Sequence, residues 1–446
     1  MSDRDTRAWL TSYRAALVLP VVAPAITDGA VLVQGDRIVW VGPRRDHPAA
    51  PNARVVELGH MVLTPGLVNA HTHLDLTVLR GLLDGLPFFG WIRAIVAARG
   101  QLTPDEWLDS ARLGAIEALE AGVTTLADTS PTSASFAAMR ELGLRGIAYL
   151  EVFGPDPAQV DDAMAGLRGR LDELRSRQTS LVRLGVSPHA PYSVSDALYA
   201  AAAAYARESG LPIATHVAES DAESDLVARG AGPFAELLRA RGIAVSPRAR
   251  TPVALLDRLG VLGDDALLIH CVTCDDADIA AICAKRAAVA FCPHSNRYFG
   301  HGDAAGVRAA LQHAGGRVSV GTDSMASNID MSPLREARAA LGFAPSHTPF
   351  PAWLLATNFG ANALGLSTAV GGLKVGLQAD LAAFSVPPGT TDTTHVAVGP
   401  GASLVVVAGA ERVRDGRLVG DAAAVRARVA NSAQRLREWR LRALSL

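Results

Sequence analysis

A repeated alternation of apolar strand and helical segment, from residue 66 to about residue 320, most constrains the fold of this chain. Each short β-rich run is followed by a longer amphipathic or alanine-rich stretch, and eight such pairs succeed one another. This pattern predicts a (β/α)8 barrel of the TIM type. The predicted strands are Leu67–Ala70, Thr124–Ala127, Gly146–Val152, Val182–Val186, Ile213–Thr215, Ala266–Ile269, Ala288–Phe291 and Arg317–Val320. A doubly wound sheet is the rival fold, but no Gly-x-Gly-x-x-Gly opens a helix, so a dinucleotide site has no support.

The two flanks of the alternating region have a different pattern, in which short strand-like runs are joined by turns. On the N-terminal side the runs lie within residues 12–63, and on the C-terminal side they begin after about residue 369. We interpret the flanks as one small β-sandwich domain, split around the barrel. The predicted domains are therefore residues 1–64 with 369–446, including a C-terminal helix over 422–443, and the barrel over residues 65–368.

Charge and cysteine content restrict the class of partner and the compartment. Lys+Arg number 42 and Asp+Glu number 44, a net charge of −2, which gives no electrostatic support for nucleic acid or an anionic membrane. Apolar stretches such as Ala197–Ala206 are far shorter than the ~20 residues of a membrane span. Four clustered cysteines are too few for a disulfide framework and suit a reducing compartment. A small-molecule substrate and a cytoplasmic location are expected.

Polar side chains recur just after successive predicted strands, and in a parallel barrel all those strand ends lie on one face. Two of them, His71 and His73, are two residues apart on an extended segment, so their imidazoles point to the same side. An isolated His-x-His more often lies on a solvated strand face. Polar residues at the other strand ends make a shared metal site the better interpretation. The full set is His71 and His73 after the first strand, His189 after the fourth, His216 after the fifth, His270 after the sixth and Asp323 after the eighth.

Three of these imidazoles and the carboxylate could form a nitrogen and oxygen shell for one divalent metal ion, with a water molecule completing it. The ligands would be His71, His73, His216 and Asp323. A metal ion there would lower the pKa of its water toward ~7. Glu219, three residues after His216, could move protons between that water and a substrate nitrogen. Zinc is expected, although iron or another divalent ion would also suit these ligands.

Six motifs then occur in order along the chain: Pro65-Gly-Leu-Val-Asn-Ala-His-Thr-His73, Ser187-Pro-His-Ala-Pro-Tyr192, Thr215-His-Val-Ala-Glu219, Ile269-His-Cys271, Cys292-Pro-His-Ser-Asn296 and Gly321-Thr-Asp-Ser-Met-Ala-Ser-Asn328. Together they resemble the amidohydrolase superfamily, and within it the adenosine-type deaminases and chlorohydrolases. The resemblance implies one zinc ion held by the four ligands above, and a homodimer. It further implies that Asp323 accepts the proton of the attacking water, Glu219 protonates a ring nitrogen and His270 orients the hydroxide.

The scarcity of lysine separates subtypes of that superfamily. The resemblance implies that members with two metal ions carry a carboxylated lysine after the fourth strand. In this chain the corresponding segment, residues 182–191, contains no lysine. A mononuclear site is therefore expected. Such a site with a glutamate beside it suits hydrolytic deamination of an aromatic amine, in which ammonia leaves the ring.

The substrate is predicted from residues that are less specific to the family than the metal ligands are. His189-Ala-Pro-Tyr192 is similar to a motif of enzymes acting on adenine nucleosides and their thioether derivatives, in which the histidine contacts the substrate. The segment Leu79–Trp91 resembles the loop and helix that cover the pocket. Members that deaminate S-adenosylhomocysteine carry a glutamate near the position of Arg99. We therefore expect substrate binding by Trp91, Arg99, His189 and Arg297.

A positive charge at Arg99 and Arg297 could face an anionic substituent, although both could equally be surface charges. The chain resembles the aminodeoxyfutalosine deaminases of menaquinone biosynthesis in general organisation, so 6-amino-6-deoxyfutalosine is the leading expected substrate. Three alternatives stay open. They are deamination of S-adenosylhomocysteine or methylthioadenosine, hydrolysis of a ring chloride or cyclic amide by the same fold, and a barrel kept as a non-catalytic scaffold.

Overall fold

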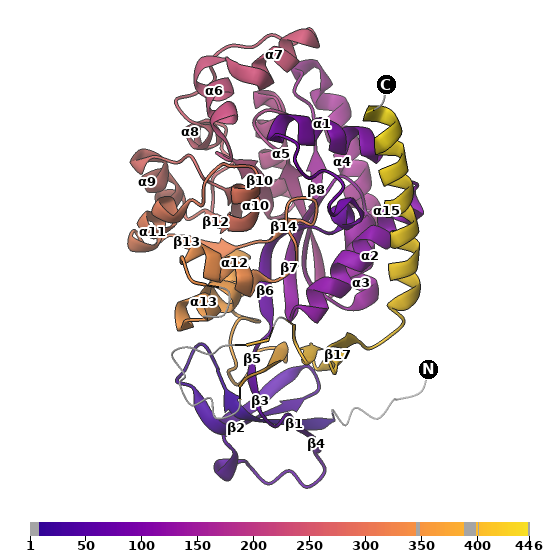
Figure 1. The fold of residues 1–446 in the computed structure, drawn as a ribbon. Coiled ribbons are helices and arrows are strands. Elements are labelled where there is room, and N and C mark those ends of the chain that lie inside the picture. Colours follow the sequence, from indigo (N-terminus) through magenta and orange to yellow (C-terminus); the bar gives the residue numbers. More distant parts are fainter. Residues whose placement is uncertain (1–8, 345–347, 388–397, 400, 445–446) are drawn as a thin grey trace. The chain divides into compact units, whose positions relative to one another are not determined.

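The computed structural model describes residues 9–344, 348–387, 398–399 and 401–444 of the 446-residue chain (Figure 1). Contacts between residues divide the chain into two compact units. One is formed by Met1–Val68, Glu117–Thr125 and Ser332–Gly420, and the other by Asn69–Ile116, Leu126–Met331 and Asp421–Leu446.

A parallel sheet of nine strands organises the second unit. In spatial order the strands run β13-β12-β11-β10-β9-β8-β7-β6-β14. The two outer strands, β13 and β14, are separated only by Gly321 and Thr322, and β14 pairs with β6. The eighth strand is thus in two pieces that pair with opposite edges, and the sheet closes on itself. The bounds are β6 Leu67–His73, β7 Val123–Ser130, β8 Arg145–Val152, β9 Val182–Pro188, β10 Ile213–Val217, β11 Ala266–His270, β12 Ala288–Phe291, β13 Arg317–Val320 and β14 Asp323–Ser324. The predicted barrel is confirmed, with a strand at each of the eight predicted positions.

A helix that covers the outside of these strands presents an apolar stripe to them. In α4 the stripe is Met164, Leu167, Leu171 and Leu174, and α4 packs on β8 and β9. None of the described helices is long and apolar enough to cross a membrane. The helices are α1 Phe88–Arg99, α2 Pro104–Glu120, α3 Ala134–Leu142, α4 Val160–Arg175, α5 Asp196–Glu208, α6 Asp221–Arg229, α7 Gly232–Ala240, α8 Pro252–Arg258, α9 Asp276–Lys285, α10 Pro293–Tyr298, α11 Ala305–His313, α12 Pro333–Ala340, α13 Phe350–Leu354, α14 Gly360–Ala363 and α15 Ala423–Leu444.

The arginine-rich helix α15 lies alongside α2 (Figure 1, yellow). Arg428 donates to both carboxylate oxygens of Asp109 at 2.6 and 2.9 Å, and Ser432 donates to Glu106 at 2.7 Å. The Arg428 guanidinium lowers the pKa of Asp109. The sequence suggested that α15 belongs with the flanking β domain, whereas these contacts group it with the barrel unit.

The second sheet joins the two ends of the chain. Its order is β18-β17-β16-β15-β5-β1-β2-β3, with β4 beside β1. Strand β5 pairs antiparallel with β15, which brings Leu63 opposite Ala383. The predicted split β domain is therefore confirmed. The strands are β1 Leu10–Val18, β2 Ile26–Gln34, β3 Arg37–Pro43, β4 Arg54–Glu57, β5 Met61–Pro65, β15 Leu381–Ser385, β16 Leu404–Val407, β17 Ala410–Arg414 and β18 Arg417–Leu418.

The domain boundaries proposed at residues 64 and 369 remain a proposal. The contact grouping assigns residues 332–420 to the unit of the second sheet, so that α12, α13 and α14 fall with it. A buried apolar cluster that includes Tyr13, Val31 and Leu381 fills this unit.

Close packing between barrel strands gives a prediction for stability. A β-carbon on Gly146 in β8 would overlap the backbone oxygen of Leu126 in β7, and the glycine has φ +152°. Gly146→Ala should therefore lower the free energy of unfolding by about 3 kcal/mol or more. Gly169→Ala in α4 is the matched control, since nothing lies within 4 Å of its β-carbon position. That change should be stabilising by up to about 1 kcal/mol. Urea unfolding of both variants checks the pair.

Candidate active site

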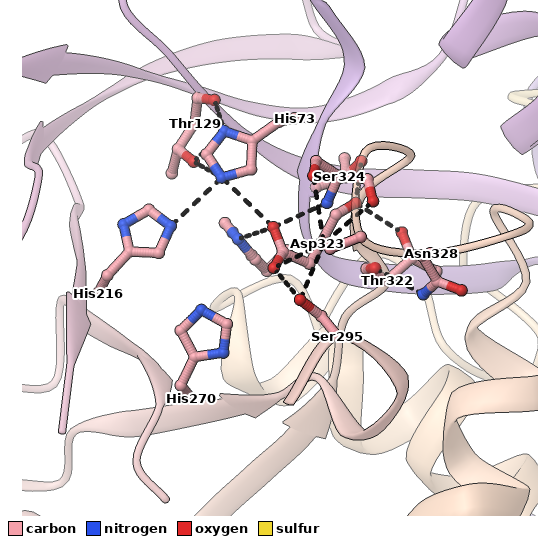
Figure 2. Close-up of polar contacts among 12 residues, drawn as sticks. His73, Thr129, His216, His270, Ser295, Thr322, Asp323, Ser324 and Asn328 are labelled. Atoms are coloured by element: carbon pink, nitrogen blue, oxygen red, sulfur yellow. Dashed lines mark hydrogen bonds and ion pairs between the residues drawn. The ribbon is translucent and has the colours of Figure 1, made fainter. Parts of the chain in front are cut away.

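The predicted metal ligands meet at the carboxyl ends of the barrel strands. His71 and His73 end β6, His216 lies in β10 and Asp323 begins β14. All four are buried, with exposed fractions of 7% or less. Figure 2 shows the side chains of His73, His216 and His270 directed toward one another beside Asp323. The parallel order of the strands is what brings residues about 250 positions apart together.

Backbone carbonyls fix the tautomers of two of these histidines. His73 Nδ1 lies 2.8 Å from the Thr129 carbonyl, and His216 Nδ1 lies 3.1 Å from the His189 carbonyl. A carbonyl only accepts, so each Nδ1 carries the proton and each Nε2 has a free lone pair. The two Nε2 atoms are 3.3 Å apart. The two nitrogens are therefore close enough to bind the same metal ion.

The donor set fits a metal ion. Nε2 of His71 and Nε2 of His73 each lie 3.5 Å from Asp323 Oδ1. Ligand atoms of His71, His73 and His216 all lie within 4.8 Å of one another, as do those of His71, His270 and Asp323. Both ring nitrogens of His71 are buried and have no hydrogen-bond partner. A buried imidazole left in this way costs free energy unless another group, such as a metal ion, binds it.

Both carboxylate oxygens of Asp323 also accept hydrogen bonds from neighbouring serines. Ser295 Oγ donates to Asp323 Oδ2 at 2.6 Å, and the Ser324 amide donates to Oδ1 at 2.7 Å. The backbone of Asp323 is left-handed, with φ 57°, and so is that of His270, with φ 77°. Such strain at strand ends persists where the surrounding structure fixes a side chain in position.

Burial favours the neutral forms of His73, His216 and His270, and the neighbouring histidines favour the charged form of Asp323. Burial, followed by the charge of His71, lowers the pKa of His73 to about 3, and burial lowers the pKa of His270 to about 4. Burial alone would raise the pKa of Asp323, but the close approach of His71, whose Nε2 lies 3.5 Å from Oδ1, holds it well below its usual range. Neutral imidazole and ionised carboxylate are the forms that bind a metal ion.

Glu219 lies beside this cluster with 4% of its surface exposed. Its Oε1 is 3.7 Å from His270 Nε2 and 3.9 Å from His301 Nδ1. Burial raises its pKa well above the usual range, and the charges of Asp323 and Glu223 add to this. At neutral pH Glu219 can therefore hold a proton and donate it.

Glu223 was missed in the sequence and fixes the turn that carries Glu219. Its two carboxylate oxygens accept the amides of Ala218 at 2.8 Å and Glu219 at 3.0 Å. Ser220 caps α6 and accepts the Glu223 amide at 3.3 Å. The Ser-x-x-Glu spacing is a capping-box pattern, so a local signal for this residue was present in the sequence.

A cavity of about 650 Å³ opens onto the cluster. Three of the predicted substrate-binding residues line it, namely Trp91, Arg99 and His189. The Arg99 guanidinium lies 5.9 Å from the centre of the Phe153 ring. Helix α1 contributes much of the apolar wall, which agrees with the prediction that this segment covers the pocket.

Arg297 is not among the residues that line this cavity. It extends from α10 toward Asp303, with 3.3 Å between Nη2 and Oδ2, and its side chain is 43% exposed. These contacts do not support a role of Arg297 in substrate binding, which stays a prediction. The preceding residue of α10, Asn296, is buried and its Oδ1 accepts from His270 at 2.9 Å, whereas Arg297 is exposed.

Glu151, near the end of β8, is a second acidic residue that the sequence reasoning missed. It is 1% exposed and lines the cavity, and burial raises its pKa to about 8. The sequence contained a signal for this residue, because an acidic residue inside an apolar strand is destabilising unless a partner compensates for its desolvation.

Most of the chain matches one protein family. Residues 62–418 match the model of the amidohydrolase family. The chain belongs to that family. A short segment, residues 29–50, also matches an imidazolonepropionase-like composite domain of bacteria. The prediction of a metal-dependent hydrolase of this family is confirmed.

Similar proteins come from several members of the family. A 5-methylthioadenosine/S-adenosylhomocysteine deaminase of Moorella thermoacetica is 31% identical, with 82% of this chain and 83% of the relative covered. An adenosine deaminase of Xanthomonas campestris, solved with bound zinc, has a TM-score of 0.82 at 26% identity and covers 96% of this chain and 98% of its own. Aminofutalosine deaminase of Helicobacter pylori shares the fold, with a TM-score of 0.78 at 22% identity over 90% of this chain and 99% of its own.

Proposed function

We propose that this amidohydrolase is a zinc-dependent deaminase that hydrolyses the amino group from the adenine ring of a nucleoside. The observation that carries the proposal is the conjunction of three buried imidazoles, one carboxylate and a buried Glu219 in an aromatic-lined cavity. The names of the relatives at 31% and 26% identity, which are deaminases of adenine nucleosides, support the same reaction.

His71, His73, His216 and Asp323 would hold the zinc ion. A zinc ion bound there would acidify a water molecule so that the water could attack at neutral pH. Asp323 would accept a proton from that water. His270, fixed by Asn296, orients the attacking oxygen with Nε2.

Glu219 supplies the proton that the ring needs. As the oxygen adds to the amino-bearing carbon, Glu219 donates its proton to the adjacent ring nitrogen, so that negative charge does not accumulate on the ring. The proton held by Asp323 passes to the amino group, and the carbon–nitrogen bond breaks to release ammonia. The ring keeps the oxygen as a carbonyl. The proton from Glu219 stays on the ring nitrogen, and the hydroxyl proton of the adduct passes to the Glu219 carboxylate, which restores its acid form.

The leading substrate is 6-amino-6-deoxyfutalosine, which would give the enzyme a role in menaquinone biosynthesis. Two features of the cavity support it. Arg99 offers a cation for a carboxylate, and the outer wall is apolar, with Phe88, Phe153 and Phe234. An aromatic acid attached to the nucleoside would meet both features.

Methylthioadenosine or S-adenosylhomocysteine is the second candidate, favoured by the names of the relatives that are 30% or more identical. The thioether fits the apolar wall equally well. Zinc content per chain and ammonia release should be measured with 6-amino-6-deoxyfutalosine, adenosine, S-adenosylhomocysteine, methylthioadenosine, guanine and a chlorotriazine. No ammonia from any adenine compound would overturn the proposed function. Chloride release would identify a ring hydrolase, and no product at all a scaffold.

Arg99 gives a prediction that separates the substrates. Arg99→Ala should lower kcat/KM for the benzoate-bearing nucleoside about 10- to 100-fold, because a charge-assisted hydrogen bond contributes about 1.5–3 kcal/mol. The same change should lower kcat/KM for adenosine by less than about threefold. Arg297→Ala is the matched control, since it removes an arginine outside the cavity. Equal losses on both substrates would leave Arg99 without a role in recognising an anion.

We further propose a cytoplasmic homodimer without a nucleic-acid or membrane partner. Four cysteines that form no disulfide support a reducing compartment, and a net charge of −2 argues against a polyanionic partner. The dimer rests on the family resemblance. Sedimentation equilibrium at micromolar concentration tests it, and a single monomeric species would contradict it.

A further inference from the structure

We propose that Glu151 is a substrate-binding residue that accepts hydrogen bonds from the hydroxyl groups of the sugar attached to the base, and so selects nucleosides with an intact ribose. The inference rests on the proposed function, because it takes the substrate to be an adenine nucleoside. It is carried by the placement of Glu151 in the cavity rather than by its position in any motif.

Glu151 has no partner within the described chain. Both of its carboxyl oxygens are buried and make no hydrogen bond. Arg170, which lies close by, donates at 2.7 Å to the backbone carbonyl of Glu151 and not to its side chain. A buried carboxyl group left in this state costs several kcal/mol, which a merely structural residue would not sustain.

Other buried carboxylates near the site each have at least one oxygen that accepts a hydrogen bond. Glu223 accepts two backbone amides, Asp323 accepts from Ser295 and Ser324, and Asp75 accepts from Ser130. Among the described residues, His71 is the other side chain with two buried polar atoms that both lack a partner. For His71, binding of the metal ion would explain why its ring nitrogens have no hydrogen-bond partner. In Glu151 the missing partner must come from whatever fills the cavity.

The position of Glu151 indicates which part of a nucleoside it would meet. One of its oxygens lies within 4.8 Å of a ring nitrogen of His189 and one of His216, so it is close to the metal centre. Glu219 and His270 also line the cavity and contact each other. A base that presents its amino-bearing carbon to the metal and its ring nitrogen to Glu219 would therefore have its sugar within reach of Glu151.

The surroundings favour a neutral donor over a cation. Arg99 is close enough to lower the pKa of Glu151 by its charge and would repel an ammonium group. The wall beyond it includes Phe153 and Ile95, which suits an apolar substituent further out. Vicinal hydroxyl groups donate to a carboxyl group without adding charge, and they match this environment.

A second metal ion held by Glu151, His189 and His216 is the rival interpretation. His216 Nε2 lies 3.3 Å from His73 Nε2, so its lone pair already serves the first centre. His189 Nδ1 pairs with Ser193 Oγ at 2.7 Å. An ion there would have to share His216, which the arrangement of the first four ligands disfavours.

The test compares adenosine with 2′,3′-dideoxyadenosine on the zinc-loaded wild type, Glu151→Met and Glu151→Gln. The wild type should lose about 10- to 100-fold in kcat/KM without the hydroxyl groups, as expected for hydrogen bonds to a carboxyl group. Glu151→Met should bring this ratio below about threefold by losing activity on adenosine alone, and Glu151→Gln should be intermediate. Asp162→Asn, which removes an exposed carboxylate from the same cavity, should keep the wild-type ratio.

Two further measurements do not depend on turnover. The Tm of substrate-free Glu151→Met should equal or exceed that of the wild type, because an unpaired buried carboxyl group is removed. A fall of more than about 5 °C in both variants would make Glu151 structural. Zinc content should be one ion per chain in the wild type and in all variants. Two ions per chain in the wild type and one in the Glu151 variants would support the rival interpretation.

The outcomes separate the two proposals. A wild type that deaminates both nucleosides equally well, or variants that keep its discrimination, would overturn the assignment of Glu151 alone. A wild type that releases ammonia from no adenine compound would overturn the proposed function, and this inference with it.

Discussion

Replacing Glu219 by glutamine is expected to lower kcat about 10²- to 10⁴-fold, the usual contribution of a positioned general acid, while the protein keeps its metal ion. Glutamine has nearly the same shape but carries no transferable proton. Glu219 lies beyond the four ligands and approaches His270 at 3.7 Å, so the metal shell should be undisturbed. Ammonia release and zinc content per chain, measured on the same preparation, check both parts. Asp221→Asn, two residues away and exposed, is the control that should retain activity.

The pH dependence of the wild type follows from the same residue. Burial raises the pKa of Glu219 above that of a free glutamate, so its acid form persists above pH 4.5. Turnover that needs this proton is present below the raised pKa and is lost as the pH rises through it. The corresponding limb of the kcat profile should be missing from Glu219→Gln. A variant with normal turnover, or with an unchanged limb, would remove Glu219 from the proton transfer.

Replacing His71 by alanine is expected to remove both metal and activity. Metal binding of about 10–16 kcal/mol, typical of structural zinc sites, is shared among four ligands, so losing one should weaken binding on the order of 100-fold or more. His71 is 1% exposed, and no water can readily replace its ring nitrogen. Zinc content after dialysis and residual ammonia release should both fall to background.

The matched control for that variant is His313→Ala, which removes an exposed histidine at the end of α11. It should retain one zinc ion per chain and wild-type kcat. Chelation of the wild type should reproduce the His71→Ala phenotype, and added zinc should reverse chelation but not the substitution. Full zinc content in His71→Ala would show that the metal centre is not where we propose it.

Local pattern was enough to predict the barrel and the residues of the metal cluster. Each strand carries its own apolar run and each helix its own periodicity, so the eight pairs could be found without knowledge of contacts. His71, His73, His216, His270 and Asp323 follow directly from this, because a parallel barrel places every strand end on one face. Their roles as ligands and catalytic groups remain a proposal.

Residues away from the strand ends were harder to predict. Arg99 and Arg297 had the same status in the sequence, yet Arg99 lines the cavity and Arg297 pairs with Asp303 on the outside. The difference depends on which way α1 and α10 face, and the packing of side chains against the barrel determines this. Glu151 was read only as part of a strand, because its lack of a partner is a property of the assembled interior.

The His71-Thr-His73 pair and its distant partners were therefore determined by the sequence itself, since strand periodicity and strand order are local properties that a parallel barrel converts into proximity. Which polar groups remain unsatisfied inside the cavity was decided only by the tertiary structure. Hydrogen-bond satisfaction depends on distances between side chains from many elements. That is why Glu151 and the turn held by Glu223 became visible only once those elements were packed together.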